Sequence, residues 1–160
     1  MDPIGFSSHD HADCISGNLA QIEEQCRATG LQLTAVRRRV LEMLLAEHRA
    51  LGAYDILDKL RAEGLGSQPP VAYRALDFLV SNGFAHKIER LNAFVACAQP
   101  GQSHAPAFLI CRKCEIVAEA QTEPARGALG SSAKQAGFQI ERAVVEAEGI
   151  CSNCAKDCTT

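Results

Sequence analysis

The first half of the chain carries hydrophobic residues at helical spacing in four successive segments. Apolar positions recur every three or four residues over 18–29, from Thr34 onward, over 53–63, and between Pro69 and Gly83. Thr34 suits the N-cap of the second segment, while Pro69 and Gly83 suit the first turn and the end of the fourth. The pattern therefore predicts four helices joined by short connections.

The hydrophobic period changes after the fourth predicted helix, from helical spacing to short alternating runs. Residues 84–89 and 93–97 predict two strands around a turn at 90–92, which together form a β-hairpin. Several helices followed by a hairpin are the element order of a winged helix-turn-helix domain. In that architecture the last helix before the hairpin enters the major groove of DNA.

The second half of the chain predicts short strands and one weak helix. Residues 108–110 and 116–118 are predicted strands on either side of a cysteine-containing turn, and 139–146 is a further strand. The segment 124–136 predicts a helix that its glycines weaken. Together the two halves predict an α+β fold, with a small C-terminal α/β unit whose edge strand is available for pairing.

Composition narrows the functional classes without selecting one. The 160 residues carry 16 Lys and Arg against 19 Asp and Glu, so DNA contact has to come from local clusters rather than a basic surface. No apolar run is long enough to cross a membrane. Residues 1–17 predict a flexible tail without the features of a signal peptide. We therefore expect a cytoplasmic protein.

Two Cys-x-x-Cys pairs, Cys111 with Cys114 and Cys151 with Cys154, are the strongest chemical signal in the chain. Each tight turn aims two sulfurs at one point, and two such turns make the closed tetrahedral site typical of structural Zn²⁺. In a reducing cytosol paired cysteines favour metal, with disulfides or an iron–sulfur cluster as the alternatives. A thioredoxin-like motif is disfavoured, because two matched pairs occur and neither opens a βαβ unit.

Candidate DNA contacts lie near the starts of two predicted helices. Tyr73 and Arg74 fall in the first turns of the fourth helix, where arginine can bind guanine and tyrosine can contact a thymine methyl or a phosphate. Arg37 opens a run of three arginines near the start of the second helix, which suits phosphate binding. The alternative for all of them is an ordinary solvated helix face.

The chain resembles the ferric uptake regulator family of metal-sensing bacterial repressors. Residues 30–37, residues 69–76 and the twin cysteine pairs carry the resemblance, which spans about 20–155. Within the family the chain is most similar to the zinc-responsive branch, because iron-type members usually carry a histidine- and aspartate-rich run where only His104 remains here. The segments that favour this branch are 53–58, 73–79, 86–87 and 103–111.

The resemblance implies a winged-helix DNA-binding domain over 18–90, a hinge at 91–93 and an α/β dimerisation and metal-binding domain over 94–160. It implies a repressor of zinc-uptake genes, not an enzyme. Such a repressor binds double-stranded operator DNA as a zinc-loaded homodimer, with neighbouring dimers as an option on one operator. Two zinc ions per chain are implied. The structural ion falls on Cys111, Cys114, Cys151 and Cys154, the regulatory ion on His86, Cys97, His104 and Glu119, and the major-groove contacts on Tyr73 and Arg74.

The implied regulatory ligands are chemically suited to zinc. One thiolate, two imidazoles and one carboxylate make a four-coordinate, borderline-soft set. Each residue also has a simpler explanation. His86 can face phosphate from the wing, Cys97 can be a small buried hydrophobe, His104 can be a lone loop histidine, and Glu119 has acidic neighbours.

Other hypotheses of function remain open at this point. Within the family they are a sensor of iron, manganese, nickel or peroxide. Outside it they are a zinc-buffering protein without DNA contact, or a thiol oxidoreductase. A zinc hydrolase would need an open coordination position beside a general base, and the sequence offers no such constellation. His9, His11, Cys14 and Cys158 are metal-capable side chains outside the family pattern, with no assigned role.

Overall fold

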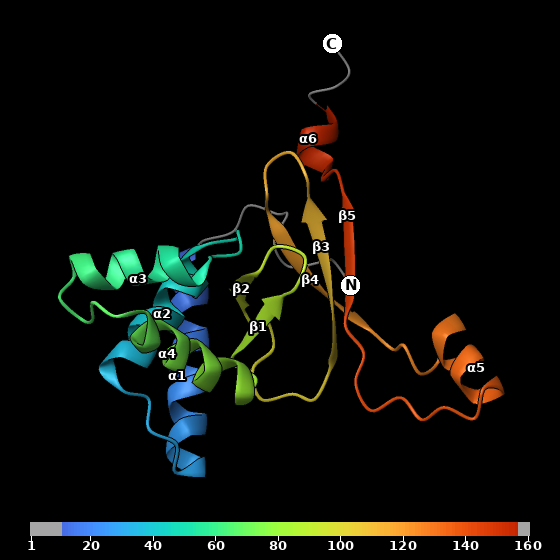
Figure 1. The fold of residues 1–160 in the computed structure, drawn as a ribbon, viewed down its shortest axis with the longest axis horizontal. Helices are drawn as coiled ribbons and strands as arrows, with labels where there is room; N and C mark the ends of the chain where they lie inside the picture. The colour runs from blue at the N-terminus through green and yellow to red at the C-terminus, as the bar shows by residue number, and fades with distance from the viewer. Residues whose placement is uncertain (1–10, 157–160) are drawn as a thin grey trace.

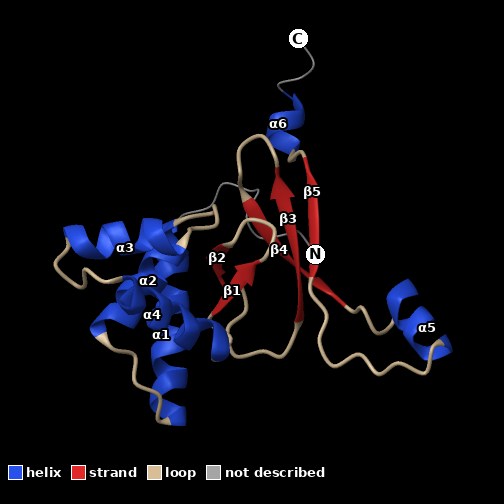
Figure 2. Ribbon diagram, in the orientation of Figure 1, coloured by secondary structure: helices blue, strands red, loops and turns tan. Residues whose placement is uncertain are grey.

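The computed structural model, which describes residues 11–156, consists of a helical half, a small hairpin and a three-stranded sheet (Figure 1). Helices α1–α4 lie on one side, the hairpin β1–β2 lies between them and the sheet, α5 lies at the far end, and α6 follows the end of β5 (Figure 2). The elements are α1 (His11–Thr29), α2 (Ala35–Ala46), α3 (Ala53–Ala62), α4 (Pro69–Ser81), β1 (Ala85–Ile88), β2 (Ala93–Ala96), β3 (Ala105–Cys111), β4 (Val117–Thr122), α5 (Ala128–Gln135), β5 (Val145–Gly149) and α6 (Ser152–Lys156).

The four predicted helices are present, and the first is longer than predicted. Helix α1 begins at His11, so the expectation that all of residues 1–17 form a loose tail is wrong for residues 11–17. The physical reason is that Ile15 continues the hydrophobic spacing of Leu19 one turn further toward the N-terminus. None of the helices over residues 11–156 is long and apolar enough to cross a membrane.

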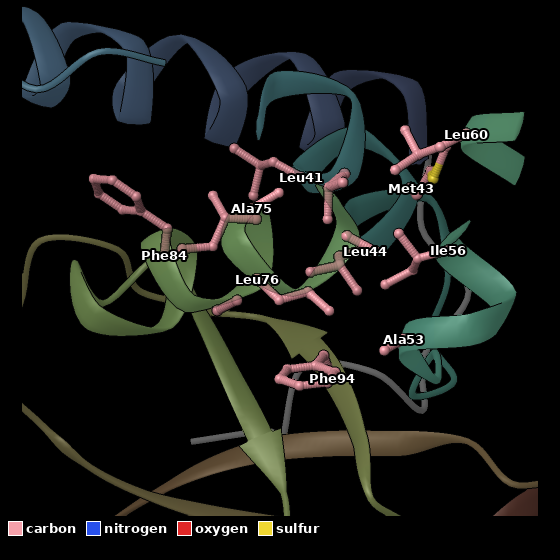
Figure 3. Close-up of a cluster of buried hydrophobic side chains, with 14 of the residues drawn as sticks. Leu41, Met43, Leu44, Ala53, Ile56, Leu60, Ala75, Leu76, Phe84 and Phe94 are labelled. Carbon is pink, nitrogen blue, oxygen red and sulfur yellow. The ribbon is translucent and has the colours of Figure 1, made fainter. Parts of the chain in front are cut away.

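One hydrophobic core holds the helical half together. Thr34 caps α2 through its side-chain oxygen, which accepts the Arg37 N–H, and prolines at the first positions of α4 preset its first turn. The buried faces of α2, α3 and α4 then meet around Leu76, with Phe84 and Phe94 closing the cluster from the hairpin side (Figure 3). The core therefore joins the hairpin to the helices as one packed unit.

The hairpin β1–β2, here called the wing together with its turn at 89–92, is regular. Its strands pair antiparallel from Ala85 opposite Ala96 to Ile88 opposite Ala93. The expected hinge at 91–93 therefore lies in the wing turn and at the start of β2, and a domain boundary there would divide the hairpin. The chain leaves the wing only after β2, through residues 97–104.

The C-terminal sheet has the strand order β4-β3-β5. Strand β3 pairs antiparallel with β4 and parallel with β5, and α5 lies in the connection from β4 to β5. The predicted strand over 139–146 begins only at Val145, because pairing with β3 starts there, at Ala107. Strand β5 forms an outer edge of the sheet.

A second, smaller hydrophobic cluster lies between the wing and the sheet. Ile88 and Val95 from the wing pack against three sheet residues, Phe108, Ile110 and Val117. The loop between α2 and α3 adds β-bridges to both sides, since Arg49 pairs with Ile116 and Leu51 pairs with Phe94. The wing therefore rests on the sheet through an apolar contact.

Candidate metal centres and DNA-binding face

The four predicted regulatory ligands converge where the wing meets the sheet. His86 lies on β1, Cys97 directly follows β2, His104 directly precedes β3 and Glu119 lies on β4. One ligand atom of each lies within 4.8 Å of those of the others. We call this cluster the junction site. It draws its ligands from the wing, the linker and the sheet.

The distances within the junction site fit a four-coordinate metal. A tetrahedral zinc with bonds of about 2.0–2.3 Å places its ligand atoms roughly 3.4–3.8 Å apart. His86 Nε2 lies 3.4 Å from Glu119 Oε1, and Cys97 Sγ lies 3.7 Å from His104 Nε2. His104 Nε2 lies closer to Glu119 Oε1, at 2.6 Å, because these two groups hydrogen-bond directly. Among the described residues, the buried His86 Nε2 has no hydrogen-bond partner, which suits a metal ligand.

Backbone groups orient the ligands, and sequence analysis did not find them. The Ala98 N–H donates to Glu119 Oε2 at 2.8 Å, and the Gln99 N–H donates to Cys97 Sγ at 3.4 Å. His104 Nδ1 lies 2.8 Å from the carbonyl oxygen of Gln102, an arrangement that fixes the imidazole with Nε2 turned into the site. No sequence signal marks these contacts, because every residue has a backbone N–H or C=O of this kind.

Burial and hydrogen bonding give the junction ligands unusual proton affinities. Burial, reinforced by the nearby Glu119 carboxylate, raises the pKa of the Cys97 thiol to about 12. Burial also favours the neutral form of Glu119, but the His86 imidazole and the Ala98 N–H outweigh it, and the pKa of this carboxyl is lowered. For His104 burial lowers the pKa, yet the Gln102 carbonyl and Glu119 outweigh it and the net pKa is raised. Without metal the site therefore holds a neutral thiol beside a carboxylate–imidazole pair.

The second cluster consists of the four paired cysteines. Cys111 ends β3, Cys114 follows in the β3–β4 turn, and Cys151 and Cys154 lie after β5 and in α6. Their sulfurs lie within 4.8 Å of one another, and the Sγ atoms of Cys114 and Cys151 are 3.7 Å apart, close to the edge of a tetrahedral ZnS₄ site. Backbone N–H groups of Cys114 and Cys151 lower the pKa of Cys111 to about 6, which favours its thiolate.

A closed four-thiolate site has a structural rather than a chemical role. The parallel pairing of β3 with β5 places Cys111 opposite Gly149, so the two cysteine turns end neighbouring strands of one sheet. A metal there ties the C-terminal end of the chain to the centre of the sheet. His9 and Cys158 lie outside the described residues, as do the side chains of His11 and Cys14.

The first turns of α4 face solvent, as a DNA-contacting helix requires. Tyr73 is 43% exposed and Arg74 is also exposed, while the opposite face of the helix lies in the core. Arg37 is held differently, because its guanidinium stacks on Phe78 at 3.9 Å and donates to the Gln32 carbonyl at 2.7 Å. Its role in phosphate binding stays a prediction, as do the base contacts of Tyr73 and Arg74.

A winged helix-turn-helix domain joined through a metal-ligand cluster to a cysteine-closed sheet defines a metal-responsive transcription regulator. The model of the ferric uptake regulator family matches residues 28–148, and the chain belongs to this family. It is a transcription regulator and not an enzyme.

Individual relatives agree with this assignment. The chain is 38% identical over 139 residues to the zinc uptake regulation protein of Escherichia coli (strain K12), covering 86% of this chain and 81% of that one. A solved zinc uptake regulator complexed with zinc and DNA superposes with a TM-score of 0.84 at 36% identity, over 91% of this chain and 98% of that one. Holo XcZur gives 0.77 at 38% identity (88% and 98% covered), and apo XcZur gives 0.51 at 39% (89% and 99% covered).

Proposed function

We propose that the protein is a zinc-responsive transcriptional repressor that binds operator DNA as a homodimer and represses zinc-uptake genes in the cytoplasm. One observation carries the proposal: four zinc-type ligands from the wing, the linker and the sheet meet in one largely buried cluster. The zinc- and DNA-bound forms of the relatives support it as well.

The comparison with XcZur bears on the state of the molecule. The holo and apo forms of that protein have nearly the same sequence identity to this chain, 38% and 39%, yet their TM-scores are 0.77 and 0.51. Sequence divergence cannot account for that gap. The arrangement of helices, wing and sheet described here is therefore more similar to the holo form of XcZur than to its apo form, which supports a metal-competent junction site.

The proposed mechanism follows from the origin of the ligands. A bound zinc ion ties the wing, through His86, to the sheet, through Glu119. Cys97 and His104 stand at the two ends of the linker over 97–104. When both bind the metal, the linker allows fewer positions of the wing relative to the sheet. We therefore divide the chain into a DNA-binding part that ends with β2, this linker, and a dimerisation part that starts with β3. Linkage then requires operator DNA to raise zinc affinity in return.

The exposed apolar surface of the dimerisation part supports a homodimer. Phe138 is 68% exposed and Leu129 is 55% exposed, although both are large and apolar, and α5 has no buried residue. Strand β5 adds an unpaired edge to the same part of the molecule. We infer that a second copy covers this surface, which places two α4 helices on one DNA site.

The test removes one junction ligand and keeps the rest of the protein. Cys97→Ser is expected to bind one zinc ion per chain instead of two, by elemental analysis, and to remain a folded dimer. The DNA probe is selected from a random library with the zinc-loaded wild type. Zinc-dependent binding of Cys97→Ser to this DNA is expected to fall at least about 100-fold. The reason is that zinc no longer holds the wing against the sheet as strongly.

The matched control is Cys26→Ala, which removes a buried cysteine from the helical core. It is expected to keep both zinc ions and zinc-dependent binding. Zinc-dependent DNA binding that survives in Cys97→Ser would overturn the proposal. DNA binding driven by iron, manganese or nickel but not by zinc would identify a sensor of another metal. Zinc binding by the protein without any DNA binding would identify a buffering protein.

A further inference from the structure

One row of residues across the sheet faces the wing. The strand register places Phe108 of β3 opposite both Glu119 of β4 and Glu146 of β5, so the three side chains point to the same face. Glu119 belongs to the junction site, and the Phe108 ring packs against His86 with centroids 5.5 Å apart. The third member of the row, Glu146, also contacts the wing, but at its tip.

Glu146 accepts two consecutive backbone hydrogen bonds from the wing turn. The Glu89 N–H donates to Oε1 at 2.7 Å and the Arg90 N–H donates to Oε2 at 3.0 Å. Glu148, on the same side of β5, accepts a hydrogen bond from Arg90 Nε at 2.9 Å. We call these contacts the wing clamp. They involve none of the metal-ligand residues, and both acidic residues come from the edge strand of the dimerisation part.

The wing in turn is joined rigidly to the DNA-binding helix. Phe84 lies between α4 and β1, and its N–H donates to the carbonyl oxygen of Leu79 in α4 at 2.8 Å. Its carbonyl oxygen accepts the Cys97 N–H at 2.9 Å, and its ring is fully buried in the helical core. A force that fixes the wing tip therefore also fixes the orientation of α4 relative to β5.

We propose that Glu146, assisted by Glu148, is a positioning residue that holds the wing and α4 in the DNA-binding orientation without metal. We call this orientation, in which the wing rests on the sheet, the closed state. Glu146 thereby sets the zinc concentration at which the molecule closes. The inference rests on the proposed function, because it names a second contribution to the same closure. The wing clamp and zinc stabilise the same closed state. Loss of the clamp lowers the fraction of zinc-free molecules that are closed, and the apparent zinc affinity falls in proportion to that fraction.

The contacts set the size of the effect. The two contacts of Glu146 are charge-assisted hydrogen bonds from backbone amides to a partly exposed carboxylate, a type that contributes modestly in water. Two adjacent bonds of this kind predict that Glu146→Ala raises the apparent Kd of the junction zinc by about three- to tenfold. Glu146→Gln keeps the size of the side chain and one acceptor oxygen, and should give a smaller increase.

The experiment uses the full-length dimer with its structural zinc in place. Junction-zinc affinity is measured by competition with a chelator of known affinity, and amide hydrogen exchange is followed at Glu89 and Arg90 in the zinc-loaded protein. We expect Glu146→Ala to speed exchange at these two amides at least about tenfold. The graded order Ala, then Gln, then wild type distinguishes positioning from general destabilisation. The matched control is Glu123→Ala. It removes a carboxylate that pairs with Arg126, and it should change neither zinc affinity nor amide exchange.

The outcomes separate the wing clamp from the proposed function. Faster exchange at Glu89 and Arg90 together with weaker zinc binding supports the clamp. Unchanged exchange, or faster exchange with zinc affinity within twofold of wild type, overturns it. Neither readout involves DNA. A wild type that fails to bind DNA with zinc would refute the proposed function while the two measurements still decide whether Glu146 positions the wing.

Discussion

At the scale of single residues, Cys97 combines features that sequence patterns treat separately. It is 1% exposed, as a core cysteine would be, yet its sulfur faces His104 and a carboxylate. The simpler explanation of a small buried hydrophobe is therefore incomplete, because its surroundings are polar. A buried neutral thiol of this kind has to lose its proton before it binds metal.

This requirement predicts a pH dependence of zinc binding. The pKa of Cys97 is raised to about 12, so the thiol stays protonated throughout pH 7–9 in the zinc-free site. Each zinc ion then displaces this proton, and junction-zinc affinity should rise about tenfold per pH unit over that range. Chelator competition at several pH values measures the slope. Affinity that stays flat between pH 7 and 9 would mean that Cys97 binds as a thiolate already present without metal.

At the scale of elements, local signals explain most helix boundaries. Helix α2 begins where Thr34 provides an N-cap, and α4 begins at Pro69. Elements of the C-terminal part were harder to place, because their boundaries depend on partners. Strand β5 starts where β3 lies beside it, and none of the residues of α5 is buried within this chain, so periodicity gives little information there.

The cap of α2 gives a prediction at this scale. The Arg37 N–H reaches Thr34 Oγ1 at 3.4 Å, a long bond, so Thr34→Ala should lower the free energy of unfolding by about 0.5–1 kcal/mol, the lower part of the usual range. Urea unfolding followed by the helical circular dichroism signal measures it. Thr34→Ser retains the oxygen and should lie within a few tenths of a kcal/mol of wild type. Equal losses in both variants would show that the hydroxyl does not act as the cap.

At the scale of the whole molecule, the wing is the part on which the others converge. It packs on the sheet through Ile88 and Val95, supplies His86 to the junction site and meets Glu146 at its tip. A candidate metal site, an apolar contact and hydrogen bonds thus meet on one hairpin. Since α4 is joined to that hairpin, the orientation of its exposed first turns, the proposed DNA-binding face, follows from the contacts that the wing makes with the sheet.

The exposed apolar surface predicts how the proposed homodimer responds to mutation. Phe138, 68% exposed, is expected to be covered by the second copy, so Phe138→Glu should weaken dimerisation at least about tenfold. Sedimentation equilibrium over a range of protein concentrations measures the constant. Phe138→Leu keeps an apolar side chain and should change it much less. If the charged variant dimerises as well as wild type, the interface lies elsewhere.

The sequence alone determined the four helices, the wing and the paired cysteines, since these depend on local periodicity and on motifs. By resemblance it also named the two sets of candidate metal ligands, and the structure brings each set together. The hinge that it predicted at 91–93 lies in the wing turn and at the start of β2. The residue types there are the same whether a turn closes a hairpin or separates domains. Only the tertiary structure decided that Arg37 stacks on Phe78, that backbone N–H groups orient the junction ligands, and that Glu146 meets the wing. Each of these contacts joins segments that are adjacent only after folding, and the backbone N–H groups in the last two leave no trace in the residue types.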